Sequence, residues 1–173
     1  MSLPTFLSAS LKELHESLDA ATNGLTPEQL HWRPGGRANH IAFSLWHYVR
    51  TQDNVVRFVL QRRPTVWMEG KWHERFGLDL KAQGTGMTPE DAANLRISSL
   101  GDFRTYMRQV FQESEAYVAN VKEADLDRVQ LVKPLGEMPM HRILGRTLVT
   151  HGFSHLGEIW AIRGAMGLSG SPV

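Results

Sequence analysis

Apolar residues recur every three or four positions over most of this chain, the spacing that gives an α-helix one hydrophobic face. The first such stripe is followed by Gly24 and predicts an amphipathic helix over about residues 4 to 22. Its members are Leu7, Leu11, Leu14 and Leu18. Because the positions between them are mostly polar, we expect this helix to bury the leucines and to leave its other side in water.

A second stripe predicts a long helix from Asn39 to about Arg63, where Pro64 ends it because proline cannot continue the hydrogen-bonding pattern. The apolar positions of this stripe are Ile41, Leu45, Val49, Val56 and Val59. Thr26 and Pro27 predict a short helical turn ahead of a loop with the sequence HWRPGGRA, which leads into this helix.

Two more long helices are predicted in the second half of the chain. A cap at Thr88 begins one that runs to about residue 122, with an interruption near Gly101, and the other covers about residues 140 to 167. The stripe of the first contains Phe103, Met107, Val110, Val118 and Val121. Between the two helices, the segment RVQLVKPLGEMP predicts a short strand or a hairpin.

Residues 64–88 connect the second and third predicted helices and are longer than a compact domain needs for such a link. They carry Trp67, Trp72, His73 and Phe76. One interpretation is a lid over a functional site. The other, which we favour, is an irregular segment held against the helices by its aromatic side chains.

These elements predict an all-α fold, most simply an antiparallel four-helix bundle in a single domain of residues 1–173. With 19 Lys plus Arg and 18 Asp plus Glu the formal charge is +1, so we expect no nucleic-acid partner. The N-terminus has no signal-peptide pattern, and no run of about 18 apolar residues occurs, so we expect a soluble, unprocessed, cytoplasmic protein that does not enter a membrane. Because the chain has no cysteine, a metal site must be built from histidine, carboxylate or water.

The first candidate chemistry lies in THGFSHLGEIW, residues 150–160, where His151 and His155 are four positions apart and Glu158 follows. Both rings share one face of the predicted helix, and it is the apolar face. The apolar residues of that face are Leu144, Leu148, Ile159, Ile162 and Met166. Buried imidazoles need partners, which a shared metal ion or hydrogen bonds to neighbouring groups would supply. From this helix alone, hydrogen bonds are the simpler interpretation.

The same helix holds four glycines, each at a cost of about 0.5–1 kcal/mol relative to alanine. They are Gly145, Gly152, Gly157 and Gly164. Close helix packing would offset this cost, and so would room for a ligand beside the histidines. We favour packing.

A third metal ligand would come from a facing helix, and the second predicted helix offers His40 and His47. They are seven positions apart and therefore on one side of that helix. This side also carries Ser44, Thr51 and Asn54 and lies roughly opposite the apolar stripe, so a solvated face is the simpler interpretation. The alternative is a helix covered on more than one side, by the bundle and by a partner subunit, because Phe43, Trp46 and Phe58 also fall outside the stripe. Periodicity leaves open which of the two histidines reaches inward.

Three longer segments carry a family resemblance that we judge to cover nearly the whole chain. They are LTPEQLHWRPGGRANHIAFSLWHYVRTQDN, GKWHERFGLD and THGFSHLGEIWAIRGAMG. Together they resemble the DinB-like (DinB/YfiT) family of metal-dependent helical-bundle proteins. The resemblance implies an up-down-down-up four-helix bundle, often a homodimer, with metal ligands at His47, His151 and His155. His40 stands where relatives commonly have a small polar residue, so it either adds a fourth ligand or lines the entrance.

The resemblance also implies a nickel, zinc, iron or manganese ion, because such ions are bound in this family, and a low-molecular-weight thiol as co-substrate. Three neutral imidazoles leave a coordination position open, as in catalytic sites. We therefore expect a metal-dependent enzyme that acts on small molecules, of a thiol-dependent transferase or hydrolase type. The alternative is a metal- or ligand-binding stress-response module without catalysis, and a third interpretation is that the histidines are ordinary core residues.

Two further groups have candidate roles at this site. Glu158 would orient a ligand imidazole or transfer a proton, although a solvated carboxylate is the ordinary interpretation. Trp32, Arg33 and Arg37 would form one wall with an anion-binding contact, but we favour a loop held in place by its tryptophan.

Overall fold

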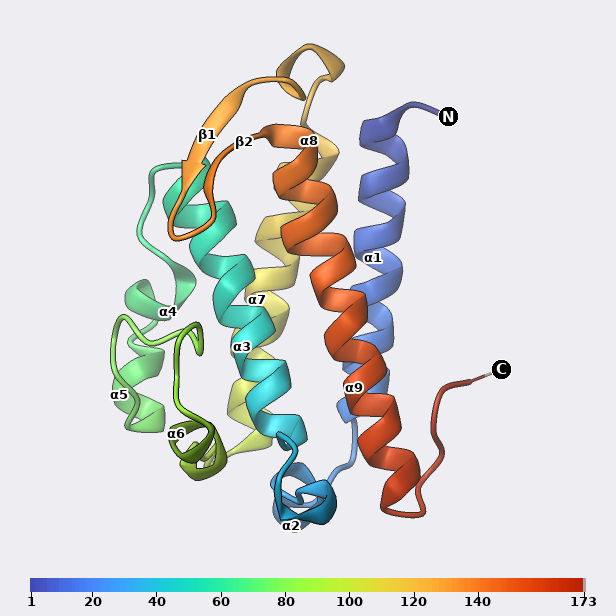
Figure 1. The fold of residues 1–173 in the computed structure, drawn as a ribbon. Helices are drawn as coiled ribbons and strands as arrows, with labels where there is room; N and C mark the ends of the chain where they lie inside the picture. Colours follow the sequence, from blue (N-terminus) through green and yellow to red (C-terminus); the bar gives the residue numbers. More distant parts are fainter. Residues whose placement is uncertain (173) are drawn as a thin grey trace.

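The computed structural model describes residues 1–172 and consists mainly of helices (Figure 1). Four long helical stretches make up most of it. They are α1 (Leu3–Thr22), α3 (Ile41–Asp53) with its π-helical continuation η2 (Asn54–Leu60), α7 (Leu100–Ala119), and the run of α8 (Met140–Arg142), π-helical η4 (Ile143–Thr150) and α9 (His151–Ala165). The mostly helical architecture predicted from the hydrophobic pattern is confirmed, with one small sheet added.

Short elements fill the connections between the long helices. They are α2 (Pro27–Leu30), η1 (Pro34–Gly36), α4 (Val66–Glu69), α5 (Trp72–Phe76), α6 (Pro89–Asn94), η3 (Glu123–Asp125), β1 (Val129–Val132) and β2 (Gly136–Pro139). The two strands pair antiparallel and form the predicted hairpin. In Figure 1 the hairpin lies at one end of the long helices and α2 at the other.

The first helix, α1, forms as predicted because local signals agree with its hydrophobic stripe. Ser2 caps it by accepting a hydrogen bond from the backbone N–H of Thr5, and Pro4 occupies the first turn. All four leucines of the stripe are buried. The helix gives way to Gly24, whose φ of +72° is one that glycine adopts without strain.

The second predicted helix is confirmed to within a few residues at each end. α3 begins at Ile41 because His40 caps it, its Nδ1 accepting a hydrogen bond from the backbone N–H of Phe43. The helical path then continues through the π-helical segment η2 to Leu60, shortly before Pro64.

α4 and α5 occupy the first part of the connection between α3 and α7, and both are held in the core. The carboxylate of Asp53 accepts hydrogen bonds from the backbone N–H groups of Val66 (2.8 Å) and Trp67 (2.9 Å). Trp67 and Trp72 are buried, and the ring of Phe76 stacks against both. The interpretation as an aromatic-held segment is therefore confirmed for this part of the connection.

The interruption predicted in the third long helix lies earlier than Gly101. α6 ends at Asn94 and α7 begins at Leu100, where the hydroxyl of Ser99 accepts a hydrogen bond from the backbone N–H of Asp102 (3.2 Å). Gly101 itself lies inside α7. A capping side chain sets the start of the helix, because it satisfies a backbone donor that has no partner within the first turn.

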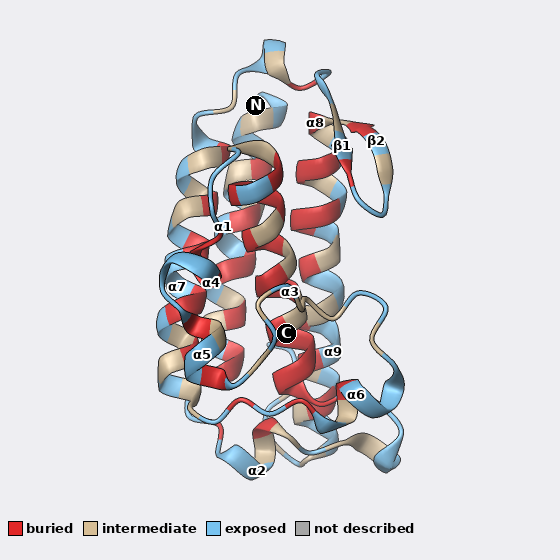
Figure 2. Ribbon diagram, turned by 90° about the vertical axis from the view of Figure 1, so that its left-hand side faces the viewer, coloured by how far each residue is buried: buried red, intermediate tan, exposed pale blue. Residues whose placement is uncertain are grey.

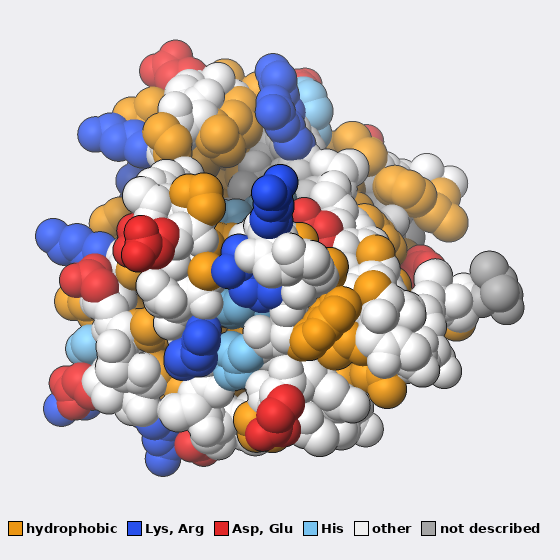
Figure 3. Space-filling model, turned by 60° about the horizontal axis from the view of Figure 1, so that its bottom comes forward, with side chains coloured by type: hydrophobic (Ala, Val, Ile, Leu, Met, Phe, Trp, Pro, Cys, Tyr) orange, Lys and Arg blue, Asp and Glu red, His pale blue; other side chains and the backbone are white. Residues whose placement is uncertain are grey.

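The long helices pack around one core. α1 and α3 each contact both α7 and α9, and Figure 2 shows buried residues on the faces that these helices turn toward one another. Figure 3 shows a surface on which hydrophobic and charged side chains are mixed, with histidine side chains recessed near its middle. Within residues 1–172, no helix combines the length and the apolar character needed to cross a bilayer.

Candidate metal centre

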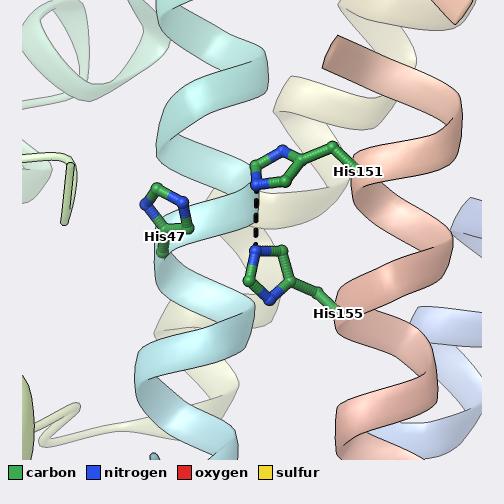
Figure 4. A group of neighbouring side chains, drawn as sticks. All are labelled: His47, His151 and His155. Atoms are coloured by element: carbon green, nitrogen blue, oxygen red, sulfur yellow. Dashed lines mark hydrogen bonds between the residues drawn. The ribbon is translucent and has the colours of Figure 1, made fainter. Parts of the chain in front are cut away.

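Three histidines from distant parts of the chain meet between α3 and α9 (Figure 4). Each of these residues, His47, His151 and His155, offers one ring nitrogen. The three nitrogens lie within 4.8 Å of one another. The ring centroid of His47 is 5.2 Å from that of His151 and 5.2 Å from that of His155. The structure thus brings together the three residues that the resemblance identified.

α9 comes close to its neighbours at Gly152, one position after the first of its two histidines. A Cβ atom at Gly152 would lie 2.3 Å from Cδ2 of Leu14 and 2.7 Å from the ring of Tyr48. The packing interpretation is therefore right for this glycine. It does not explain Gly157 and Gly164, where an added Cβ would meet no atom of the described chain within 4 Å.

Hydrogen bonds at Nδ1 fix the tautomers of two of the three rings. Nδ1–H of His47 donates to the carbonyl of Gln83 (2.5 Å), and Nδ1–H of His155 donates to the carboxylate of Glu158 (2.8 Å). A neutral imidazole with its proton on Nδ1 carries a lone pair on Nε2. Both rings therefore present Nε2 as a ligand atom, and partners of this kind at the other nitrogen are typical of metal-ligating histidines.

The third ring, that of His151, faces the second one directly. Its Nε2 is 3.0 Å from Nε2 of His155, the contact drawn as a dashed line in Figure 4. Its Nδ1 is shielded from water and has no hydrogen-bond partner among the described residues. Either Nε2–H of His151 donates to His155, or both lone pairs point at a shared cation. Three convergent imidazole nitrogens are a donor set that fits a divalent metal ion.

Burial favours the neutral, metal-binding form of His47 and His151. It lowers the pKa of His47, and burial together with the neighbouring His155 and His47 lowers the pKa of His151 to about 4. The hydrogen bond from His155 lowers the pKa of Glu158 below its ordinary value. At neutral pH the rings of His47 and His151 are therefore uncharged, and the carboxylate of Glu158 is ionised.

Glu158 ties the histidine pair on α9 to α3. Its Oε2 accepts hydrogen bonds from both His155 Nδ1 and the hydroxyl of Ser44 (3.0 Å). This contact fits the orienting role predicted for Glu158. Sequence reasoning assigned Ser44 no role, although its position three residues before His47 places it on the same side of α3.

The second part of the long connection covers the side of α3 that the sequence suggested was solvated. The guanidinium of Arg50 donates to the carbonyls of Leu80 (3.3 Å) and Ala82 (3.1 Å). The next residue, Gln83, accepts the hydrogen bond from His47 across a separation of 36 positions in the sequence. The interpretation of this side as a solvated face is therefore wrong, because a segment much later in the chain packs over it.

A cavity of about 210 Å³ opens beside His47 and His151. Its walls come from α3 and η2, from the connection around Gln83, from the hairpin turn at residues 132–135, and from η4. The site is thus reached from a space that four separate parts of the chain enclose.

His40 is not a member of the histidine cluster. Its Nδ1 caps α3, its side chain is buried, and its ring packs edge-on to His31 with centroids 5.2 Å apart. It does not line the cavity either. Neither role that the resemblance suggested for His40, a fourth ligand or part of the entrance, fits this position.

The loop before α3 also stays outside the cavity. Trp32 is 38% exposed, so it does not hold the loop in the core as expected. Nε–H of Arg33 donates to the carbonyl of Ala38 within the same loop (2.8 Å). Neither these residues nor Arg37 line the cavity beside the histidines, so the wall that the sequence suggested is not formed there.

Comparisons with known proteins give a fold and a family. A search of the curated proteins finds no match. Among solved structures, the crystal structure of a conserved protein from Enterococcus faecalis shares the fold, with a TM-score of 0.81, 20% sequence identity, and coverage of 96% of this chain and 99% of that one. The sequence model of the DinB superfamily matches residues 10–159. This chain therefore belongs to the DinB superfamily.

Proposed function

We propose that this protein binds one divalent metal ion through His47, His151 and His155 and catalyses a reaction of small molecules at that ion. The convergence of three imidazole nitrogens is the observation that carries the proposal. The reaction is of the transferase or hydrolase type, with a low-molecular-weight thiol as co-substrate. Nickel, zinc, iron and manganese all suit the proposal, because metal availability decides among ions that imidazole accepts.

The metal, when bound, supplies Lewis acidity that favours the deprotonated form of a small nucleophile such as a thiol or water. The protein's own groups prepare the site. The carbonyl of Gln83 holds the ring of His47, and the carboxylate of Glu158 holds that of His155 while Ser44 steadies the carboxylate. Glu158 is thus a positioning residue in this proposal, and the cavity beside the histidines admits the substrate.

The proposal extends to the architecture. We propose a single domain, residues 1–173, built as an up-down-down-up four-helix bundle that pairs as a homodimer. The paths of α1, α3, α7 and α9 in Figure 1 support this order of helices. Light scattering during size-exclusion chromatography tests the dimer.

Elemental analysis of protein purified without a metal-affinity tag tests the metal site. We expect about one equivalent of metal per chain, lost in His47→Ala and in the double variant His151→Ala/His155→Ala. His73→Ala is the matched control, because it removes a histidine outside the cluster. Circular dichroism separates loss of metal from loss of fold. Metal content that is unchanged in the variants would overturn the proposed site.

The catalytic part has its own test. The metal-loaded protein is assayed with electrophilic and ester substrates in the presence and absence of small thiols. We expect turnover that requires metal and rises with thiol, and that His47→Ala abolishes. A protein that holds metal but shows no metal-dependent turnover in this panel would leave binding without catalysis as the better account.

A further inference from the structure

We propose that the cavity beside the three histidines selects a small organic anion, whose charged group pairs with Arg146 and Lys133 while its other end faces His47 and His151. This inference rests on the proposed metal site and adds to it the chemical class of the substrate. It is carried by three properties of the cavity, namely its shape, its polar side chains and its charge.

The shape of the cavity suits a small molecule with one apolar side. Its volume is about 210 Å³, which is below the size of pockets for drug-sized ligands. Val55 and Val132 are buried in its walls, and Leu135 from the hairpin turn adds an apolar edge. A ligand here therefore has a short hydrocarbon part between its two polar ends.

Polar side chains also contribute to the walls of the same cavity. Thr51, Asn54 and Thr85 line it together with the two histidines. A ligand here therefore meets hydrogen-bonding groups as well as apolar ones.

The charge of the cavity gives the sign of that ligand. Arg146 and Lys133 line it, and no Asp or Glu among the described residues does. A small cavity whose only charged groups are cations concentrates anions, and a bound divalent metal ion would strengthen this preference.

The two cations are not engaged in ion pairs, unlike several basic residues elsewhere in this protein. Arg57 pairs with Glu69 and Glu113, and Arg104 pairs with Asp19. Arg146 and Lys133, by contrast, form no ion pair with any described residue. They are free to pair with the anionic group of a ligand.

A matched pair of probes tests the inference on the cobalt-loaded protein. 3-Mercaptopropionate and 3-mercaptopropionamide have nearly the same size and differ in charge, and both change the cobalt absorption spectrum when their sulfur binds. We expect the acid to bind about fivefold more tightly than the amide, the range of a solvent-exposed ion pair. In Arg146→Gln and Lys133→Gln this preference should shrink, and in the double variant it should disappear. Arg142→Gln is the control, because Arg142 is exposed and does not line the cavity.

The outcomes separate this inference from the proposed function. A protein that takes up no cobalt overturns the metal site and, with it, the inference. A protein that takes up cobalt but binds both probes equally overturns the inference alone. So does a preference for the acid that persists in the double variant. Far-UV circular dichroism of each variant establishes that the fold is retained.

Discussion

Gly84 lies against the ring of His47, so closely that a Cβ atom on Gly84 would come within 2.7 Å of Nδ1. We therefore expect Gly84→Ala to displace the ring and to lower metal affinity about tenfold or more, the usual effect of disturbing a group that orients a ligand. Isothermal titration of the metal-free protein with zinc measures the change.

The control for this substitution is Gly86→Ala. Gly84 and Gly86 have positive φ values of +88° and +79°, so alanine strains the backbone at both, but an added Cβ at Gly86 would meet no atom of the described chain within 4 Å. Equal zinc affinity in the two variants would show that backbone strain, and not contact with His47, is responsible.

The hydrogen bonds of Glu158 predict that metal affinity depends on groups that do not touch the metal. Glu158→Gln weakens the acceptor for His155, and Ser44→Ala removes the partner that steadies it. We expect zinc affinity to fall by about 10–100-fold for Glu158→Gln and by less for Ser44→Ala. The exposed Glu90→Gln is the control for loss of one negative charge. If Glu90→Gln weakens binding as much as Glu158→Gln does, the effect is one of overall charge and not of orientation.

Two glycines of α9 should respond to alanine in opposite directions. At Gly152 a Cβ would collide with Leu14 and Tyr48, so Gly152→Ala should lower the free energy of unfolding by about 1–3 kcal/mol. At Gly157 the Cβ would face open space, so Gly157→Ala should raise it by about 0.5–1 kcal/mol through helix propensity. Urea unfolding measures both. Destabilisation by both substitutions would contradict the assignment of Gly157 as a glycine without a packing role.

The lowered pKa of His40 predicts that the protein loses stability in mild acid. Burial, with the nearby His31, Arg96 and Arg33, lowers its pKa from 6.5 to about 4. Between these values the unfolded chain takes up a proton that the folded chain resists, so the free energy of unfolding falls as the pH drops from 6.5 to about 4. The contribution of this group is at most about 3 kcal/mol.

His40→Asn isolates that contribution, because asparagine can still cap α3 but does not titrate in this range. Urea unfolding of metal-free protein at several pH values is the measurement. The variant should show a shallower decline of stability than the wild type, with the remaining slope due to buried groups such as His15 and His151. An unchanged slope would mean that His40 is protonated equally easily in the folded and unfolded states.

The long helices could be predicted because each carries its own signals. The leucine stripe and Ser2 cap of α1 lie within the helix and beside it, so no distant part of the chain is needed to read them. The start of α7 was harder to predict from the sequence. Thr88 and Ser99 are both good capping residues, and each of them begins a helix, Thr88 that of α6 and Ser99 that of α7. The π-helical turns of η2 and η4 could not be predicted from hydrophobic spacing, because that spacing was compared only with the period of a regular α-helix.

The candidate site was predictable only in part. Spacing placed His151 and His155 on one face of a buried helix, but the choice of His47 over His40 came from family resemblance. Periodicity failed there because the side of α3 that carries His47 is covered by the connection at Gln83, which approaches from 36 positions away. Contacts of that kind depend on tertiary packing and have no local pattern.

The division of the proposed ligands between α3 and α9 bears on when the protein can acquire its metal. During synthesis, His47 leaves the ribosome about a hundred residues before His151, and a single imidazole holds a divalent ion only weakly. Capture of the ion must therefore follow the docking of α9. The metal would therefore stabilise a fold that has already formed. A nascent chain stalled before residue 151 would be unable to hold the metal ion.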